Sequence, residues 1–158
     1  MQITWKDLIV DQTSINIDEI LEDWRWLIPE HHTLLLVSAL GDLFLLADNQ
    51  SVFWLDTGSA LLTKVSDSIN EFNDLVRNAD KVNEWFCPEL IADLKAHGIT
   101  LGNRQCYSYK RPLTLDGTMD SANFEPADIS VHFSVLGQLQ KQVRDLPSGT
   151  KVKSVRIN

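Results

Sequence analysis

The sequence has few of the residues, and none of the motifs, on which the commonest catalytic and metal sites depend. It holds 2 cysteines, Cys87 and Cys106, in no CxxC pair or Cys/His ladder, which argues against both a disulfide scaffold and a structural zinc site. Its 7 glycines form neither GxGxxG nor GxxxxGK, and no serine stands in GxSxG. We therefore expect no nucleotide cradle, hydrolase centre, cofactor or metal.

Long apolar runs are also missing. The longest, residues 34–40, is interrupted by Ser38 and falls well short of the roughly 18 residues that a membrane span needs. The N-terminus shows no basic stretch followed by an apolar one, so no secretory signal is predicted. The expectation is a cytoplasmic protein that makes no contact with a membrane.

The composition is that of a globular protein. With 158 residues, of which 44% are hydrophobic and 23% charged, the chain is long enough to bury one core, and we expect residues 1–158 to form one domain. Within it, residues 1–38 are expected to be an N-terminal helical segment.

Charge is distributed unevenly along the chain. Residues 1–60 hold ten acids and two bases, whereas residues 61–158 hold twelve of each, so the whole net charge of −8 lies in the first part. Such a field repels nucleic acid and attracts cationic surfaces. The plainer interpretation is that acidity keeps the protein in solution.

Hydrophobic periodicity predicts an α+β fold. Apolar residues at helical spacing after Ser14 predict a helix that ends before Pro29, and residues 33–66 read as four short strands of an antiparallel meander. Ser68 and Glu71 match a capping box, and Pro88 and Gly98 bound a further helix.

The last third of the chain is less regular. Residues 99–127 are rich in turn residues and predict a long connection of the kind that often carries function. We expect ISVHFSV (129–135) to be a strand, a helix to follow it up to Pro147, and TKVKSVRI (150–157) to be a final strand. The expected fold is thus a meander of about four strands plus a C-terminal strand, packed with three to four helices.

Only a few polar or aromatic residues are candidates for a site. Asp128 and His132 are four apart, which in a strand separates them by about 13 Å, too far for an acid–base pair, although a turn would let them meet. With Tyr107 and Tyr109 as walls they could instead line a pocket built by residues 102–132. The pair His31-His32 lies in an expected exposed turn and cannot share a helix face as metal-binding pairs do.

Aromatic residues supply the remaining candidate. Most tryptophans are expected to lie in the core. Trp26 is two residues from Trp24, points elsewhere on a helix and is expected to be partly exposed as an interface anchor. The expected partner-binding surface is Asp18, Glu19, Glu22, Asp23, Trp26 and Glu30.

Several stretches resemble a known family. They are Gly41-Asp42, Trp54 to Thr57, Gln105-Cys106-Tyr107 followed by Pro112, Asp128 to His132 leading into Gly137-Gln138, and Leu146-Pro147-x-Gly149. Over residues 39–151 the sequence is similar to the C-terminal domain of a bacterial family named for an immunity protein that neutralises a type VI secretion DNase effector. Larger members carry a longer N-terminal region than the 38 residues found here. The resemblance implies that the partner is a toxin. If this toxin is a DNase, it should be a basic protein, because a DNase holds phosphates with Lys and Arg.

Three hypotheses remain open. The first is a non-catalytic binding protein that neutralises a basic protein toxin, binds no nucleic acid and uses the acidic surface for attraction. The second is a small enzyme or ligand sensor with a pocket around residues 102–132, and the third is a structural or assembly protein. The sequence leaves the oligomeric state open.

Overall fold

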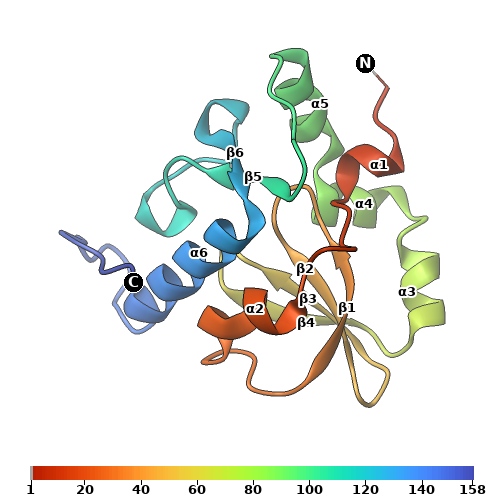
Figure 1. Ribbon diagram of the computed structural model, residues 1–158, viewed down its shortest axis with the longest axis horizontal. Helices are drawn as coiled ribbons and strands as arrows, with labels where there is room; N and C mark the ends of the chain where they lie inside the picture. The colour runs from red at the N-terminus through yellow and green to blue at the C-terminus, as the bar shows by residue number, and fades with distance from the viewer. Residues whose placement is uncertain (1) are drawn as a thin grey trace.

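A four-stranded antiparallel sheet forms the centre of the structure, a computed structural model that describes residues 2–158 (Figure 1). The strands follow one another in the order β1-β2-β3-β4, so the predicted meander is confirmed. Their bounds are β1 His32–Val37, β2 Leu43–Ala47, β3 Val52–Asp56 and β4 Leu61–Ser66. Met1, the first residue of the expected domain, lies outside the described residues. That the chain is a single domain stays a prediction.

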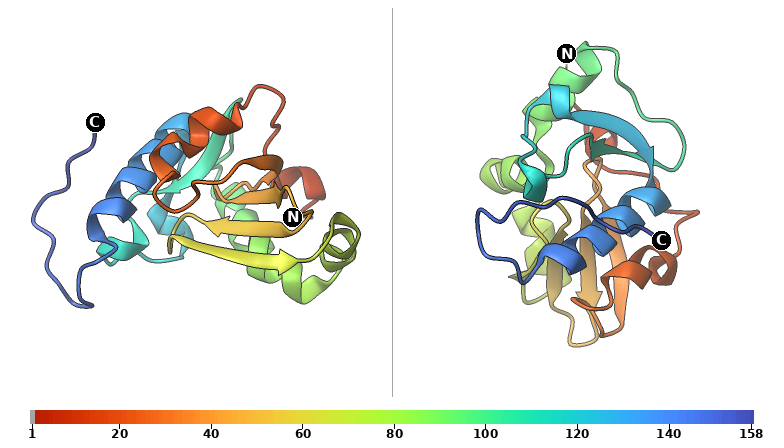
Figure 2. Two further views of the ribbon diagram at one scale, coloured as in Figure 1. Left: turned by 90° about the horizontal axis from the view of Figure 1, so that it is seen from below. Right: turned by 90° about the vertical axis from the view of Figure 1, so that its left-hand side faces the viewer.

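Helices cover the two faces of this sheet, as the period of two along each strand requires. Leu43 and Leu45 of β2 join a core cluster with α6 (Ile129–Val143), whereas Phe44 between them joins a second cluster with α4 (Ala79–Phe86). Figure 2 shows α6 on one side of the sheet and α3 (Ile69–Leu75), α4 and α5 (Pro88–Ala96) on the other. The fold is therefore a sheet between two helical layers, and the predicted α+β class is confirmed.

The N-terminal part is helical, in shorter pieces than predicted. It holds α1 (Trp5–Leu8), α2 (Ile17–Leu21) and the 3₁₀ turn η1 (Glu22–Trp24). The prediction that Ser14 begins and caps this helix is wrong. Asn16 caps α2, because its side chain accepts the N–H groups of Asp18 and Glu19 at 2.9 and 3.3 Å. Trp24 is fully buried and donates its indole N–H to the Phe133 carbonyl of α6 at 2.9 Å. This bond anchors η1 on α6.

The middle helices begin where the capping residues predicted. Ser68 accepts the Glu71 N–H at 3.1 Å, while the Glu71 carboxylate reaches the N–H of Asp67 at 3.5 Å, so only half of the expected capping box forms. Pro88 opens α5, and Gly98 follows its end with φ +75°. The sequence did not predict α4, which Asn78 caps.

Two strands in the region expected to be irregular form a second sheet. β5 (Gln105–Tyr109) pairs antiparallel with β6 (Phe124–Asp128), and two 3₁₀ turns, η2 (Leu113–Leu115) and η3 (Ser121–Asn123), lie between them. No short turn joins these strands, so the local signal that marks a hairpin is absent from the sequence.

The expected strand at residues 129–135 is wrong, because this stretch is the first half of α6. Asp128 caps the helix by accepting the N–H groups of Ser130 and Val131 at 2.8 and 3.3 Å. The buried residues of α6 recur at helical spacing, which favours a helix over a strand; they are Ile129, His132, Phe133, Leu136, Gly137, Leu139 and Gln140.

The expected C-terminal strand is also wrong. Residues 150–158 are extended but belong to neither sheet. They lie along α6, apart from any strand edge (Figure 2). Valine and isoleucine side chains among charged and polar ones produced the strand prediction. In the structure the partly buried residues are Val152 and Val155, three apart, and Ile157 is exposed, so this segment lacks the period of two of a strand.

Gly41 allows α6 to pack against the turn between β1 and β2. Its φ is +77°, and a Cβ atom there would lie 2.2 Å from Nε2 of His132. Both the backbone conformation and the close approach therefore require glycine.

We predict that Gly41→Ala lowers the free energy of unfolding by about 2–4 kcal/mol, the sum of a left-handed backbone conformation and overpacking against His132. Gly98→Ala is the matched control, because Gly98 has φ +75° and none of the described neighbours lies within 4 Å of the position that its Cβ would take. It should cost only about 1 kcal/mol. Urea denaturation measures both, and equal losses would show that the His132 contact contributes nothing.

Candidate functional site

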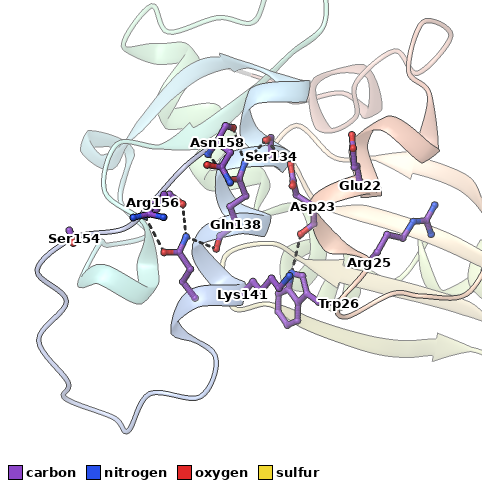
Figure 3. Close-up of a pocket in the computed structure, with 11 residues that line it drawn as sticks. Glu22, Asp23, Arg25, Trp26, Ser134, Gln138, Lys141, Ser154, Arg156 and Asn158 are labelled. Atoms are coloured by element: carbon purple, nitrogen blue, oxygen red, sulfur yellow. Dashed lines mark hydrogen bonds between the residues drawn. The ribbon is translucent and has the colours of Figure 1, made fainter.

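An open groove of about 1050 Å³ lies between η1, α6 and the C-terminal residues (Figure 3). It adjoins the surface that the sequence predicted to bind a partner. Its lining residues are Glu22, Asp23, Arg25, Trp26, Ser134, Gln138, Lys141, Gln142, Ser154, Arg156 and Asn158. The groove is thus polar, with charges of both signs.

Three of the expected partner-binding residues line this groove: Glu22, Asp23 and Trp26. The Asp23 carboxylate accepts the hydroxyl of Ser134 at 2.7 Å. Trp26 donates its indole N–H to the carbonyls of Asp23 and Gly137, at 3.0 and 3.2 Å. Its half-buried ring lies 5.1 Å from the guanidinium of Arg144, within cation–π range. Trp26 is thus partly exposed, as expected, and fixed in orientation.

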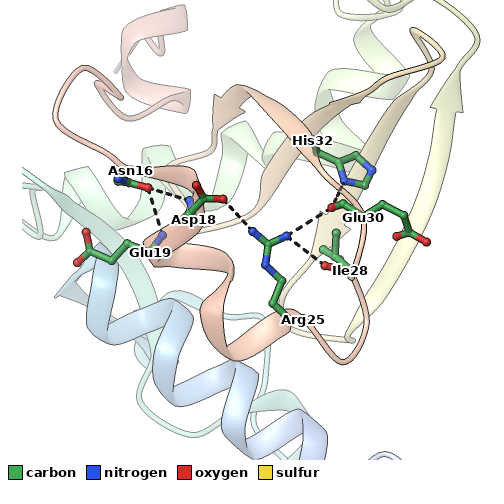
Figure 4. Close-up of polar contacts among 7 residues, drawn as sticks. All are labelled: Asn16, Asp18, Glu19, Arg25, Ile28, Glu30 and His32. Carbon is green, nitrogen blue, oxygen red and sulfur yellow. Dashed lines mark hydrogen bonds and ion pairs between the residues drawn. The ribbon is translucent and has the colours of Figure 1, made fainter.

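The other three expected residues, Asp18, Glu19 and Glu30, do not line this groove; Figure 4 shows the polar contacts around them. Asp18 forms a 2.9 Å salt bridge with Arg25, and Glu19 accepts the hydroxyl of Ser130 of α6 at 3.3 Å. Glu30 is exposed and takes part through its main-chain carbonyl, which lies 3.0 Å from Nδ1 of His32. Asp18 and Glu19 therefore also hold the N-terminal segment in place.

The groove also contains residues that sequence analysis missed. Ser134, Gln138 and Gln142 recur every four residues on α6, which places them on one face of the helix. The expected strand at residues 129–135 separated Ser134 from this face. Gln138 and Gln142 lay within the expected helix, where two glutamines four residues apart are not by themselves a sign of a binding site. Arg25 was missed because it is the one base among the acids of this segment.

The expected pocket residues do not share a common cavity wall in the contacts described. Tyr107 is buried and donates its hydroxyl to the Ile99 carbonyl at 2.7 Å, and it lines a separate groove of about 260 Å³. Asp128 is exposed at the start of α6 and serves as its cap. Tyr109 packs on Phe124 with ring centroids 4.9 Å apart, and burial, with the charges of Asp42 and Asp56, raises its pKa. A ligand pocket built from these four residues stays a prediction.

His132 is the centre of a buried polar cluster rather than a pocket wall. Its Nε2 lies 2.9 Å from the Gly41 carbonyl, and its Nδ1 lies 2.7 Å from the Ser108 hydroxyl. A carbonyl only accepts, so Nε2 carries the proton and Nδ1 accepts from Ser108. Burial lowers the pKa of His132 to about 4, against the opposing effect of the Gly41 carbonyl. The imidazole is therefore neutral near pH 7.

The same cluster extends to the turn after β3. Thr57 donates its N–H to the Asp42 carboxylate at 3.0 Å, and its hydroxyl lies 2.9 Å from the Gly41 carbonyl. Gln140 of α6 donates to the carbonyls of Thr57 and Gly58, each at 3.1 Å. Burial, reinforced by the charge of Asp56, raises the pKa of Asp42 to about 7, and the hydrogen bonds from Thr57 oppose this rise.

Ser108 and His132 form a serine–histidine contact without the remaining geometry of a nucleophilic triad. The imidazole is 2% exposed, and its other nitrogen faces a carbonyl where a triad has a carboxylate. A histidine with a pKa of about 4 is a poor general base near neutral pH. The cluster is therefore suited to holding α6 on the sheet.

The structure offers little support for metal binding within residues 2–158. No group of three or more His, Cys, Asp or Glu side chains there is arranged to hold an ion. His31 is exposed and lies 3.5 Å from Asp48, while His32 is buried against Phe53. Cys106 is a fully buried core residue, and burial raises its pKa. Cys87 is half-buried, and burial raises its pKa as well.

Over the same described residues, no helix has the length and apolar character required to span a bilayer.

Comparison with known families gives a match to the middle part of the chain. Residues 66–140 match the family T6SS immunity protein Tdi1, C-terminal. The resemblance predicted from the sequence is confirmed for this segment, which runs from the end of β4 through α3, α4, α5, β5 and β6 into α6. It is shorter than the expected 39–151, so Gly41, η1 and the C-terminal residues lie outside it. No curated protein matches the chain.

The matched family consists of type VI secretion immunity proteins, and an immunity role implies a toxin as partner. Within the matched segment lie Ser108 and His132 of the buried cluster, and Ser134 and Gln138 of the groove.

The buried cluster predicts opposite pH dependences for two variants. Between about pH 4 and 6.5 His132 binds a proton in the unfolded state but not in the folded state, so its contribution makes stability rise with pH. Asp42 has a folded pKa of about 7 and stays protonated in the folded state over much of this range while the unfolded state loses the proton, so its contribution makes stability fall with pH. Relative to the unmodified protein, Asp42→Asn should therefore add a rising slope, and His132→Gln a falling one. Each change in the slope of stability against pH is at most about 1.4 kcal/mol per pH unit. Denaturant unfolding from pH 4 to 7 measures the slopes, and unchanged slopes in both variants would contradict the burial of these groups.

Proposed function

We propose that the protein is an immunity protein that binds a toxin delivered by type VI secretion and neutralises it without catalysis. The family match over residues 66–140 is the observation that carries this proposal. The contacts of His132 are consistent with it, because the only serine–histidine pair described is buried and built as a structural link.

The charge distribution supports a basic partner. All of the net charge of −8 arises within residues 1–60, and five of the ten acids there lie in α2, η1 and the turn before β1. A nuclease toxin must hold phosphates with Lys and Arg, and an acidic surface can occupy that same basic site. We propose a nuclease as the toxin and the cytoplasm, where its nucleic acid lies, as the place of action.

The contacts of the acidic residues indicate which of them are available to a partner. Among residues 2–158, the Glu22 and Glu30 carboxylates make no hydrogen bond or salt bridge, and both residues are exposed. Asp18, Glu19 and Asp23 contact Arg25, Ser130 and Ser134. Glu22 and Glu30 are therefore the carboxylates that can be changed with the least effect on the fold, and Trp26 between them is the proposed anchor.

Direct, non-catalytic neutralisation predicts a stoichiometric titration. The purified protein is added in steps to a fixed amount of a candidate toxin encoded near its gene, and residual toxin activity is measured. Activity should fall linearly to zero at an equimolar ratio, because each molecule occupies one toxin. Loss of activity at a small fraction of that ratio would indicate an enzyme, and unchanged activity in excess protein would exclude the immunity role for this toxin.

The acidic surface predicts a rate effect that depends on its position. The variant Glu22→Lys/Glu30→Lys should associate with the toxin about tenfold more slowly at low salt, and the difference should shrink at high salt. The control Asp74→Lys/Glu89→Lys changes net charge equally on α3 and α5, at exposed residues, and should have little effect. Surface plasmon resonance measures both. Equal slowing would mean that net charge alone, rather than this surface, governs association.

A further inference from the structure

The C-terminal residues are held on α6 through their main chain. The Gln142 side chain donates to the Arg156 carbonyl at 2.6 Å and accepts the Arg156 N–H at 3.1 Å. Gln138 does the same for Asn158, at 3.2 and 2.7 Å. Each glutamine amide thus pairs with one residue as a neighbouring strand would (Figure 3). We call residues 150–158 the C-terminal arm.

The spacing of the two glutamines suits an extended chain. Four residues of a helix rise about 6 Å, and two residues of a strand advance about 6.6 Å. Gln138 and Gln142 therefore stand in register with alternate residues, Asn158 and Arg156, of an antiparallel extended segment. Because all four hydrogen bonds go to main-chain atoms, this recognition is independent of the side chains of the bound segment.

The arm has few other attachments. Val155 is partly buried and packs on the core cluster that contains α6, whereas most other arm residues are exposed. The connection from Arg144 to Gly149 is largely exposed as well. One apolar side chain and four exposed hydrogen bonds are a weak attachment, of the kind that opens locally without unfolding the domain.

We propose that this face of α6 is a docking site for an extended, basic segment of the toxin, and that the C-terminal arm occupies it as a displaceable substitute. The inference rests on the proposed function. The arm shows what the site accepts, since it carries Lys151, Lys153 and Arg156 and no acid. Glu22, Asp23 and Trp26, which were expected to bind the partner, line the same groove as the arm residues Ser154, Arg156 and Asn158.

The site can be tested without the toxin, by using the arm as a separate peptide. The probe is the fluorescein-labelled peptide TKVKSVRIN, and the protein is the full chain with Val155→Asp, which removes the apolar attachment of the arm and leaves α6 unchanged. Fluorescence anisotropy should show binding to this variant. The unmodified protein should bind at least about tenfold more weakly, since its own arm competes at an effective concentration on the order of millimolar.

Two controls make the result specific. Adding Gln138→Ala and Gln142→Ala to the Val155→Asp variant should abolish binding, because these side chains supply the main-chain contacts. The peptide TEVESVEIN, with acids in place of its bases, should bind more weakly because of Glu22 and Asp23. Absence of binding to Val155→Asp, equal binding by the unmodified protein, or binding that survives loss of both glutamines would each overturn the proposal.

Amide hydrogen exchange of the unmodified protein gives an independent measurement that needs no variant. The Arg156 and Asn158 amides should exchange more slowly than those of Lys153 and Ser154, and faster than that of Phe133 in the buried part of α6. Exchange as slow as that of Phe133 would show that the arm is a fixed part of the fold and would overturn the proposal that it can be displaced. Failure of either experiment leaves the equimolar neutralisation of the toxin untouched, so the two proposals fail separately.

Discussion

The hydrogen bond between His132 and the Gly41 carbonyl is the contact on which the arrangement of the two halves of the structure depends. It joins the first half of α6 to the turn between β1 and β2, and Ser108, Thr57 and Gln140 complete a polar cluster around it. A buried polar group is costly unless it has a partner, so this cluster tolerates only a narrow range of positions for α6. Because the floor of the groove is the opposite side of α6, the same contact fixes the geometry of the candidate binding surface.

Acidic side chains in this protein serve two roles that net charge alone does not separate. Asp23 and Glu19 accept hydroxyl groups from Ser134 and Ser130, and so attach the N-terminal segment to α6. Glu22 and Glu30 are left without such partners among the described residues. Long-range attraction depends on the sum of all these charges, whereas a short-range contact with a partner depends on the free carboxylates. The structure therefore reduces a diffuse acidic region to a small number of positions that can be tested.

Local sequence signals predicted the elements that are specified by neighbouring residues. They failed for elements whose structure depends on contacts with residues distant in the sequence. The meander followed from alternation with short turns, and α3 and α5 from Ser68, Pro88 and Gly98. β5 and β6 were missed because their pairing spans a long, turn-rich connection. ISVHFSV has the β-branched composition of a strand, yet Asp128 caps it and its apolar residues meet the core at helical spacing, so tertiary packing overrides propensity. In the candidate site, Glu22, Asp23 and Trp26 line the groove, and their role in binding stays a prediction. The strand error separated Ser134 from Gln138 and Gln142, whose hydrogen bonds to residues 156 and 158 depend on a tertiary contact that no local signal announces.

The extent of the family match separates a scaffold from the surfaces that we propose contact the toxin. The matched segment supplies most of α6, which forms the floor of the groove, and the three helices α3, α4 and α5 that follow β4. The two walls, formed by Glu22 and Asp23 on one side and by the C-terminal arm on the other, lie outside it. Specificity is a difference of affinities, and it is changed most readily by side chains that do not support the fold. A groove with a core-packed floor, the exposed Glu22 side chain on one wall and a weakly attached arm as the other meets that requirement. A change in Glu22 or in the arm alters partner contacts while His132 and Gly41 keep α6 in place.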